Sequence, residues 1–150
     1  MIAKKLAELG IDLPAALMPA FQYVPVTIHD RIAFVSGQLP RRGETFITGK
    51  AGAEVDLEQA REAARLCILQ GLACLNQALG LLDRVERILK ITGFVASAPG
   101  FNQQTKVIDA ASELLVEIFG EAGRHARSAV GVAELPRNVA VEIEMIVGLR

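Results

Sequence analysis

The sequence predicts an α+β fold, a two-layer sandwich in which two long helices cover one face of one mixed sheet. Two long stretches, residues 57–79 and about 103–119, carry apolar side chains at helical spacing. Shorter apolar stretches surround them, in the order strand, strand, helix, strand, helix, strand, strand. The length of 150 residues and the absence of repeats predict a single domain, residues 1–150.

Residues 1–20 are expected to form an N-terminal extension of this domain. A short helix is predicted over Ile2–Leu9, and Gly10 is a suitable residue to end it. Pro14 and Pro19 then indicate an irregular connection to the first strand.

The first two strands are predicted on either side of a short turn. Residues 23–28 have strand composition, and the proline within them indicates a strand at the sheet edge. Residues 29–31 turn the chain into a second strand, Ile32–Val35, which leads into Ser36-Gly37. Residues 43–49 are polar and bounded by glycines, which predicts a loop with a small amount of extended structure.

The first long helix, Leu57–Leu79, carries two parallel stripes. A stripe of small residues allows close approach to another backbone, and a stripe of large residues fills the space beside it. This pattern is typical of a helix that lies flat on a sheet. The small stripe is Ala60, Ala64, Cys67, Gly71, Cys74 and Ala78, and the large stripe is Ile68, Leu72, Leu75 and Leu79.

A long strand, Val85–Ser97, and the second long helix follow. Pro99-Gly100 ends the strand. The helix is expected from about Gln103 to Phe119, where apolar residues recur every three or four positions, and Gly120 and Gly123 end it.

The last two strands are predicted to pair as a hairpin. Residues 128–132 are small and branched, residues 139–147 are mostly apolar, and the Pro and Asn of residues 135–138 favour a tight reversal. Glu142 and Glu144 lie two residues apart and therefore on the same side of their strand. These acids must point to water or to a partner.

Composition restricts the partners of the protein. The net charge is −1, aromatic residues make up 5% and there is no Trp, which argues against nucleic acid as a partner. Hydrophobic residues make up 51% and charged residues 22%, and the mean hydropathy is +0.34. This surplus predicts a homo-oligomer that buries apolar surface between its subunits.

We expect a soluble, cytoplasmic protein without a membrane span. The start, MIAKKLAELG, lacks the apolar region of a signal peptide, and the densest apolar run, residues 66–82, contains Gln70 and is too short for a bilayer. Cys67 and Cys74 are separated by two helical turns, about 10 Å, which is too far for a disulfide. They are predicted to be small core residues in a reducing compartment.

Several catalytic motifs are excluded by spacing. Gly43, Gly49 and Lys50 suggest a phosphate loop, but the glycines are separated by five residues where the motif needs four, and no Ser or Thr follows the lysine. His29 and His125 have no partners at metal-ligand spacing. No metal site and no cofactor are therefore predicted.

Separate motifs along the chain resemble those of the YjgF-like reactive-intermediate deaminase (Rid) family. They are SGQLP at residues 36–40, ARSAVGV at 126–132, LP at 135–136 and VEIE at 141–144. Their order and spacing match from about Tyr23 onward. The resemblance implies a chorismate-mutase-like fold and a homotrimer.

The resemblance also implies roles for four residues. Arg127 would bind the substrate carboxylate with its planar fork of donors, whereas the residue without the resemblance favours a solvated strand end or a salt bridge. Glu142 would bind the attacking water, although periodicity alone cannot separate it from Glu144. Tyr23 would line the pocket, and the main chain of Gly37 would touch the ligand.

The chain departs from the common family pattern at three places. Ala129 replaces a frequent Cys, Ser112 is the nearest match to a frequent Asn, and the loop over residues 120–126 is about two residues shorter. Because Arg127 and Glu142 are retained, these departures affect the identity of the substrate more than the type of reaction.

The implied activity is hydrolytic deamination of 2-imino or enamine acids to 2-keto acids and ammonia, without a cofactor. One alternative is a protein that binds a small carboxylate or keto acid without turnover. Another is an endoribonuclease, which the charge and the scarcity of aromatic residues argue against.

The predicted hairpin also places the site. Glu142 would lie across from the region of Val130, about 10 Å along the strand from Arg127. We therefore expect one chain to supply both Arg127 and Glu142. A neighbouring subunit would close the pocket, with Tyr23 and Gly37 at its rim, so the site would lie at a subunit interface.

Overall fold

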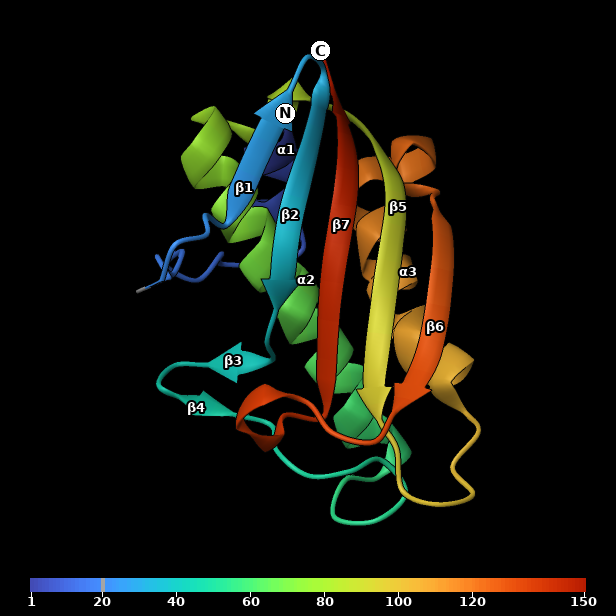
Figure 1. Cartoon of the computed structure of the whole chain (residues 1–150). Helices are drawn as coiled ribbons and strands as arrows, with labels where there is room; N and C mark the ends of the chain where they lie inside the picture. Colours follow the sequence, from blue (N-terminus) through green and yellow to red (C-terminus); the bar gives the residue numbers. More distant parts are fainter. Residues whose placement is uncertain (20) are drawn as a thin grey trace.

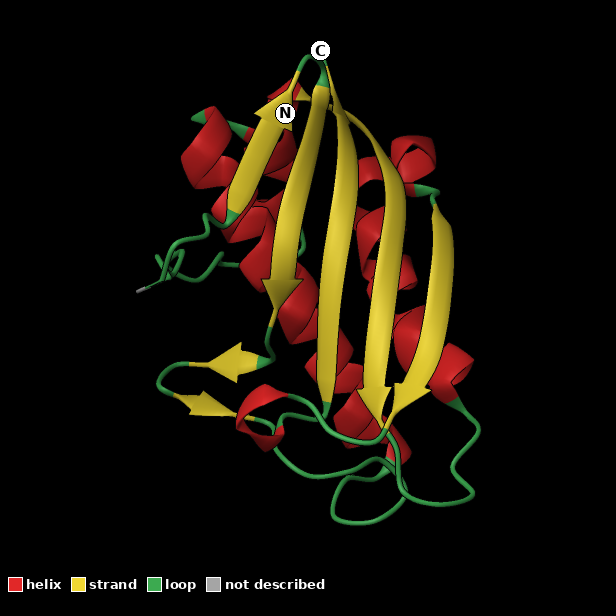
Figure 2. Ribbon diagram, viewed as in Figure 1, coloured by secondary structure: helices red, strands yellow, loops and turns green. Residues whose placement is uncertain are grey.

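The protein forms two layers, a twisted sheet and the helices that cover one of its faces (Figures 1 and 2). The structure is a computed structural model, and it describes residues 1–19 and 21–150. The predicted fold class, an α+β sandwich with two long helices on one face of a mixed sheet, is confirmed. The helices are α1 (Ile2–Glu8), α2 (Leu57–Leu79) and α3 (Gln104–Phe119), and the strands are β1 (Val26–His29), β2 (Ile32–Gln38), β3 (Arg41–Arg42), β4 (Thr45–Phe46), β5 (Val85–Ala96), β6 (Ala126–Val132) and β7 (Val141–Leu149).

The strand order of the main sheet is β1-β2-β7-β5-β6, so β1 and β6 are its edges. β1 pairs with β2, β2 with β7, and β7 with β5, all antiparallel, whereas β6 is parallel to β5. β1 is the edge strand that its proline-containing stretch predicts. A separate two-stranded ribbon, β3-β4, provides the extended structure expected near residues 43–49.

The predicted hairpin of the last two strands is wrong, because β5 lies between β6 and β7. Helix α3 connects β5 to β6 as a crossover, so β6 takes the outer edge of β5 in a parallel pairing. The chain then passes across the end of β5 through a 3-10 turn, Pro136–Asn138, before it enters β7 (Figure 1). A turn signal indicates a reversal of direction, and here the reversal joins strands that are not neighbours.

Helix α2 has well-defined ends. The Asp56 side chain accepts a hydrogen bond from the backbone N–H of Gln59 at 2.8 Å, and the Gln59 side chain accepts one from the N–H of Asp56 at 2.9 Å. This reciprocal capping box satisfies donors that the first turn leaves free. Gly80 ends the helix with φ at 84°, a conformation that glycine adopts without steric cost.

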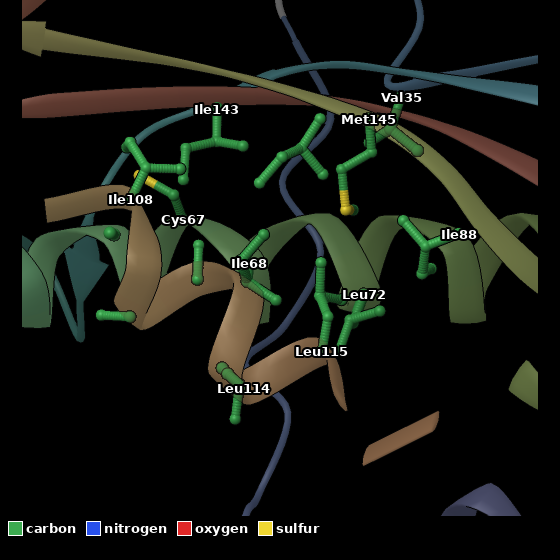
Figure 3. Packing of buried hydrophobic residues seen from close by; sticks show 14 of the residues in the cluster. Val35, Cys67, Ile68, Leu72, Ile88, Ile108, Leu114, Leu115, Ile143 and Met145 are labelled. Carbon is green, nitrogen blue, oxygen red and sulfur yellow. The ribbon is translucent and has the colours of Figure 1, made fainter. Parts of the chain in front are cut away.

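The core fills the space between the helices and the sheet (Figure 3). The small stripe of α2 permits close packing: a Cβ on Gly71 would lie 2.4 Å from the terminal methyl carbon of Met145 on β7. Ile68, Leu72 and Leu115 are fully buried between the layers. Alternate β7 residues point into this core, so Glu142 and Glu144 project from the opposite, helix-free face of the sheet.

Candidate active site

Glu142 lies on the helix-free face next to Gly37. β7 positions Glu142, and an irregularity between Val35 and Gln38 in β2 places Gly37 beside it. A Cβ added to Gly37 would lie 2.6 Å from Oε1 of Glu142. The carboxylate therefore occupies the space above the Gly37 backbone that a side chain would fill. The structure brings together these two residues, which the sequence assigned to the same site.

The surroundings of Glu142 favour its protonated form. Burial, and to a smaller degree the charge of Glu144, raise the pKa of the Glu142 carboxyl above its usual value. Glu144 is exposed and Glu142 is half-buried. Burial in the structure thus distinguishes Glu142 from Glu144 as the candidate catalytic acid, which the alternation along the strand could not do. A half-buried carboxyl with a raised pKa is suited to accepting a proton from water and donating it again.

Tyr23 lies close to the same end of β2, in the segment that precedes β1. The Ser36 hydroxyl donates a hydrogen bond to the carbonyl of Val24 at 2.8 Å, and the Ser36 N–H donates one to the carbonyl of Pro25 at 2.9 Å. These bonds attach the segment to β2. Tyr23 and Gly37 consequently line one cavity of about 260 Å³.

Arg127 is held by helix α3. Its guanidinium forms an ion pair with Asp109 at 2.8 Å and donates a hydrogen bond to the Ser112 hydroxyl at 3.1 Å. A longer contact, 3.4 Å, reaches the carbonyl of Thr105. Sequence reasoning identified Ser112 but missed Asp109, although the two lie three positions apart on one helix face, a spacing that could have revealed it.

Within one chain, Arg127 and Glu142 project from opposite faces of the sheet. Arg127 is aligned with Ile91 on β5, and Ile91 is aligned with Met145, which points into the core. Glu142 is aligned with Phe94 on the other face. Neighbouring residues in register share a face, so the expectation that one chain supplies both residues to one pocket is wrong.

The two cysteines are buried packing residues. Burial, and secondarily the charge of Glu142, raise the pKa of the Cys67 thiol well above its usual value, and burial raises the pKa of Cys74. The Cys67 thiol also lies 3.5 Å from the carbonyl of Val141. Both thiols therefore stay protonated at neutral pH, which makes them poor nucleophiles.

Residues 1–19 and 21–150 contain no cluster of three or more His, Cys, Asp or Glu side chains able to hold a metal ion. No helix in the same part of the chain is long and apolar enough to cross a membrane.

The arrangement of the sheet and the sequence motifs both have counterparts in known proteins. Residues 3–148 match the family described as "YjgF/chorismate_mutase-like, putative endoribonuclease". The chain belongs to the YjgF/chorismate mutase-like family. The resemblance drawn from the motifs near Gly37, Arg127 and Glu142 is thereby confirmed.

Individual proteins are similar to this chain over 90% or more of its length. Protein TCP17 of Trypanosoma cruzi is 45% identical, over 99% of this chain and 94% of the relative. The crystal structure of Atu1372 from Agrobacterium tumefaciens, a protein described as of unknown function, has a TM-score of 0.92 at 46% identity, covering 99% of this chain and 92% of that one. Escherichia coli TdcF with bound serine has a TM-score of 0.63 at 27% identity, covering 90% and 93%.

Proposed function

We propose that the protein hydrolyses 2-imino and enamine acids to 2-keto acids and ammonia. The observation that carries the proposal is the carboxyl of Glu142, which is half-buried, has a raised pKa and lies against the backbone of Gly37. Membership of the YjgF family supports it, as does the small amino acid bound by the relative TdcF.

The proposed reaction requires only positioned acid–base groups. The carbon of a protonated imine is electrophilic, so water can add to it once a base accepts a proton from the water. Glu142 takes that proton as the C–O bond forms and a carbinolamine results. It then returns the proton to the amine nitrogen. As the C–N bond breaks, Glu142 accepts the proton of the carbinolamine hydroxyl, the C=O group of the keto acid forms, and ammonia leaves. That proton passes from Glu142 to the ammonia, so the positive charge of the imine ends on ammonium and Glu142 is again ionised.

Arg127 would hold the substrate carboxylate in a pocket formed with a second copy of the chain. Since Arg127 and Glu142 lie on opposite faces of one sheet, Arg127 of one subunit has to meet Glu142 of the next. The helix-free face also exposes apolar side chains, Ile32, Phe34 and Val130, which an assembly would cover. We therefore propose a homotrimer with its sites at the subunit interfaces.

A coupled assay tests this activity. An amino-acid oxidase generates a 2-imino acid in place, and its loss is followed with and without the protein. The wild type should exceed the buffer rate, and Glu142→Gln should lower the rate by roughly 100-fold or more while 2-keto acid binding persists. Glu144→Gln, which removes the exposed acid on the same strand face, is the matched control and should keep its turnover.

The same assay separates the enzyme from a binding protein. A protein that only binds carboxylates would bind a 2-keto acid without accelerating loss of the imine. Arg127→Lys keeps the charge but loses the planar fork, so it should fold normally and lose most keto-acid binding. If the wild type binds a keto acid but imine loss is no faster than in buffer, the protein is a binding protein and the enzyme proposal is wrong.

A further inference from the structure

The cavity that Tyr23 and Gly37 line is also positively charged. Its described lining includes two arginines, Arg41 and Arg137, and no acidic residue. At about 260 Å³ it is several times larger than the roughly 30 Å³ that one water occupies in the liquid. It is therefore large enough for a polar group of a ligand.

Both guanidinium groups are available to a ligand. Among the described residues, neither Arg41 nor Arg137 forms an ion pair, whereas the adjacent Arg42 is paired with Glu62 at 2.7 Å. The guanidinium of Arg137 lies over the ring of Phe46, 4.7 Å from its centre. This cation–π contact fixes its place without neutralising its charge.

A buried amide completes the cavity. Gln70 on α2 lines it and is only 3% exposed, and its Oε1 is the one fully buried side-chain oxygen or nitrogen in the described residues that lacks a hydrogen-bond partner. A buried polar group without a partner costs free energy. The wall of the cavity thus combines two free cations with a buried amide, whose N–H groups can donate hydrogen bonds to an anion.

Gly37 connects this cavity to the proposed reaction centre. It lines the cavity, and its backbone lies directly under the Glu142 carboxylate. Gly37 is therefore shared by the two places: one side of it faces the Glu142 carboxylate and it also lines the cavity, so a substrate whose reacting carbon is held at Glu142 can extend its side chain toward the cavity. The end of that side chain would reach the two arginines.

We propose that the cavity binds a second, distal acidic group of the substrate, so that the preferred substrates are 2-imino acids with a carboxylate at the far end of the side chain. The inference rests on the proposed function for the position of the reacting carbon. Arg41 and Arg137 bind the distal carboxylate by charge-assisted hydrogen bonds. Gln70 takes part through its amide N–H donors, because an ionised carboxylate has no hydrogen to donate to the amide oxygen.

Direct binding tests this proposal with two keto acids of equal length. Calorimetry compares 2-oxoglutarate with 2-oxopentanoate, which has a methyl group in place of the distal carboxylate. The wild type should bind 2-oxoglutarate more tightly by about tenfold, the effect of a charge-assisted hydrogen bond. Equal affinities, or no binding of either acid, would overturn the proposal.

Variants of the cavity locate the effect. Arg41→Gln and Arg137→Asn should each weaken the binding of 2-oxoglutarate by roughly fivefold and leave the affinity for 2-oxopentanoate unchanged. Asparagine suits position 137 because φ there is 58° and Asn tolerates this conformation. Arg42→Gln, at the next residue but outside the cavity, is the matched control and should change neither affinity. A preference for 2-oxoglutarate that persists in both folded cavity variants would overturn the assignment.

Two additional measurements serve as controls. One tests whether Gln70 acts on the ligand or on the stability of the fold, and the other tests whether the cavity accepts any anion. Gln70→Met keeps the side-chain length, and it should weaken 2-oxoglutarate without lowering the melting temperature, since it removes an unsatisfied group. Inorganic phosphate should compete only weakly; if equimolar phosphate abolishes the preference, the cavity is a general anion site and the substrate class is wrong. Because these readouts need no turnover, a wild type that binds 2-oxoglutarate but deaminates nothing would reject the proposed function and retain the cavity assignment.

Discussion

Glu142 combines a half-buried carboxyl with a position on the open face of the sheet. Its pKa is higher in the folded protein than in the unfolded chain, because burial disfavours its charged form and Glu144 adds a like charge. The folded state therefore binds this proton more tightly. The resulting stabilisation is complete below the unfolded pKa and is lost as the pH rises through the folded pKa.

The substitution Glu142→Gln should reveal this loss of stability with rising pH. Gln carries no charge at any pH, so the stability of the variant relative to the wild type should rise between acidic and neutral pH. Urea denaturation at several pH values measures the difference. Glu44→Gln, in the exposed turn between β3 and β4, is the control. A difference for Glu142→Gln that stays constant with pH would contradict the raised pKa.

At the scale of elements, the irregular end of β2 sets the position of the carboxylate. Val35 pairs with Met145 and Gln38 pairs with Ile143, so the two pairs are three positions apart along β2 but only two positions apart along β7. The extra residue lets Gly37 lie under Glu142 without disturbing the core side of the strand. The reactive carboxylate is thus supported by backbone, which moves less than a side chain.

Gly37→Ala should displace the Glu142 carboxylate and leave the fold intact. The new Cβ would lie 2.6 Å from Oε1 and 3.0 Å from the carboxyl carbon, so the side chain has to move. We expect a loss of turnover of roughly 100-fold, since a shift of about 1 Å can have that effect. Turnover and thermal unfolding are measured together, and unchanged turnover would show that the position of the carboxylate is unimportant.

Gly148→Ala is the matched control for this substitution. Gly148 lies in the same strand as Glu142, on the same face, and the nearest atom to an added Cβ there is 3.7 Å away. This is an ordinary van der Waals distance, so both stability and turnover should stay close to those of the wild type.

The elements could be predicted from sequence more reliably than their pairing. The bounds of α2 followed from its two stripes, and the acid beside Gly37 followed from two motifs. The pairing of β6 could not be deduced, because a turn between two strands does not show that a third strand lies between them. Gln70, Arg41 and Arg137 belong to distant segments, and only the tertiary structure brings them to one cavity.

At the scale of the whole molecule, the opposite directions of Arg127 and Glu142 predict complementation between chains. The inactive variants Arg127→Lys and Glu142→Gln are mixed, unfolded and reassembled together. In a randomly mixed 1:1 trimer, roughly one quarter of interface pockets receive both intact residues. Activity in the coupled assay should return to about this fraction of the wild-type value. Each variant reassembled alone is the control, and a mixture that stays inactive would reject a shared pocket.

The exposed apolar residues of the helix-free face predict how assembly can be broken. Phe34 is 46% exposed in the isolated chain, so Phe34→Glu should leave the protomer folded but place a charge inside the proposed interface. Sedimentation at micromolar concentration should show a trimer for the wild type and a 16.1 kDa monomer for the variant. Gln77→Glu, at an exposed position of α2 in the helical layer, is a control for added charge away from that face. A wild type that sediments as a monomer would exclude the trimer.

The central place of β7 in the sheet also determines when the protein can fold during synthesis. β2 and β5 are separated by β7, which lies between them although it follows every other strand in the sequence. A nascent chain that has released only residues up to β6 holds two sheet fragments, β1-β2 and β5-β6, with no shared strand. Their inner edges stay open to other chains until β7 emerges from the ribosome. The strand that carries Glu142 is therefore also the one that joins the two fragments into a single sheet.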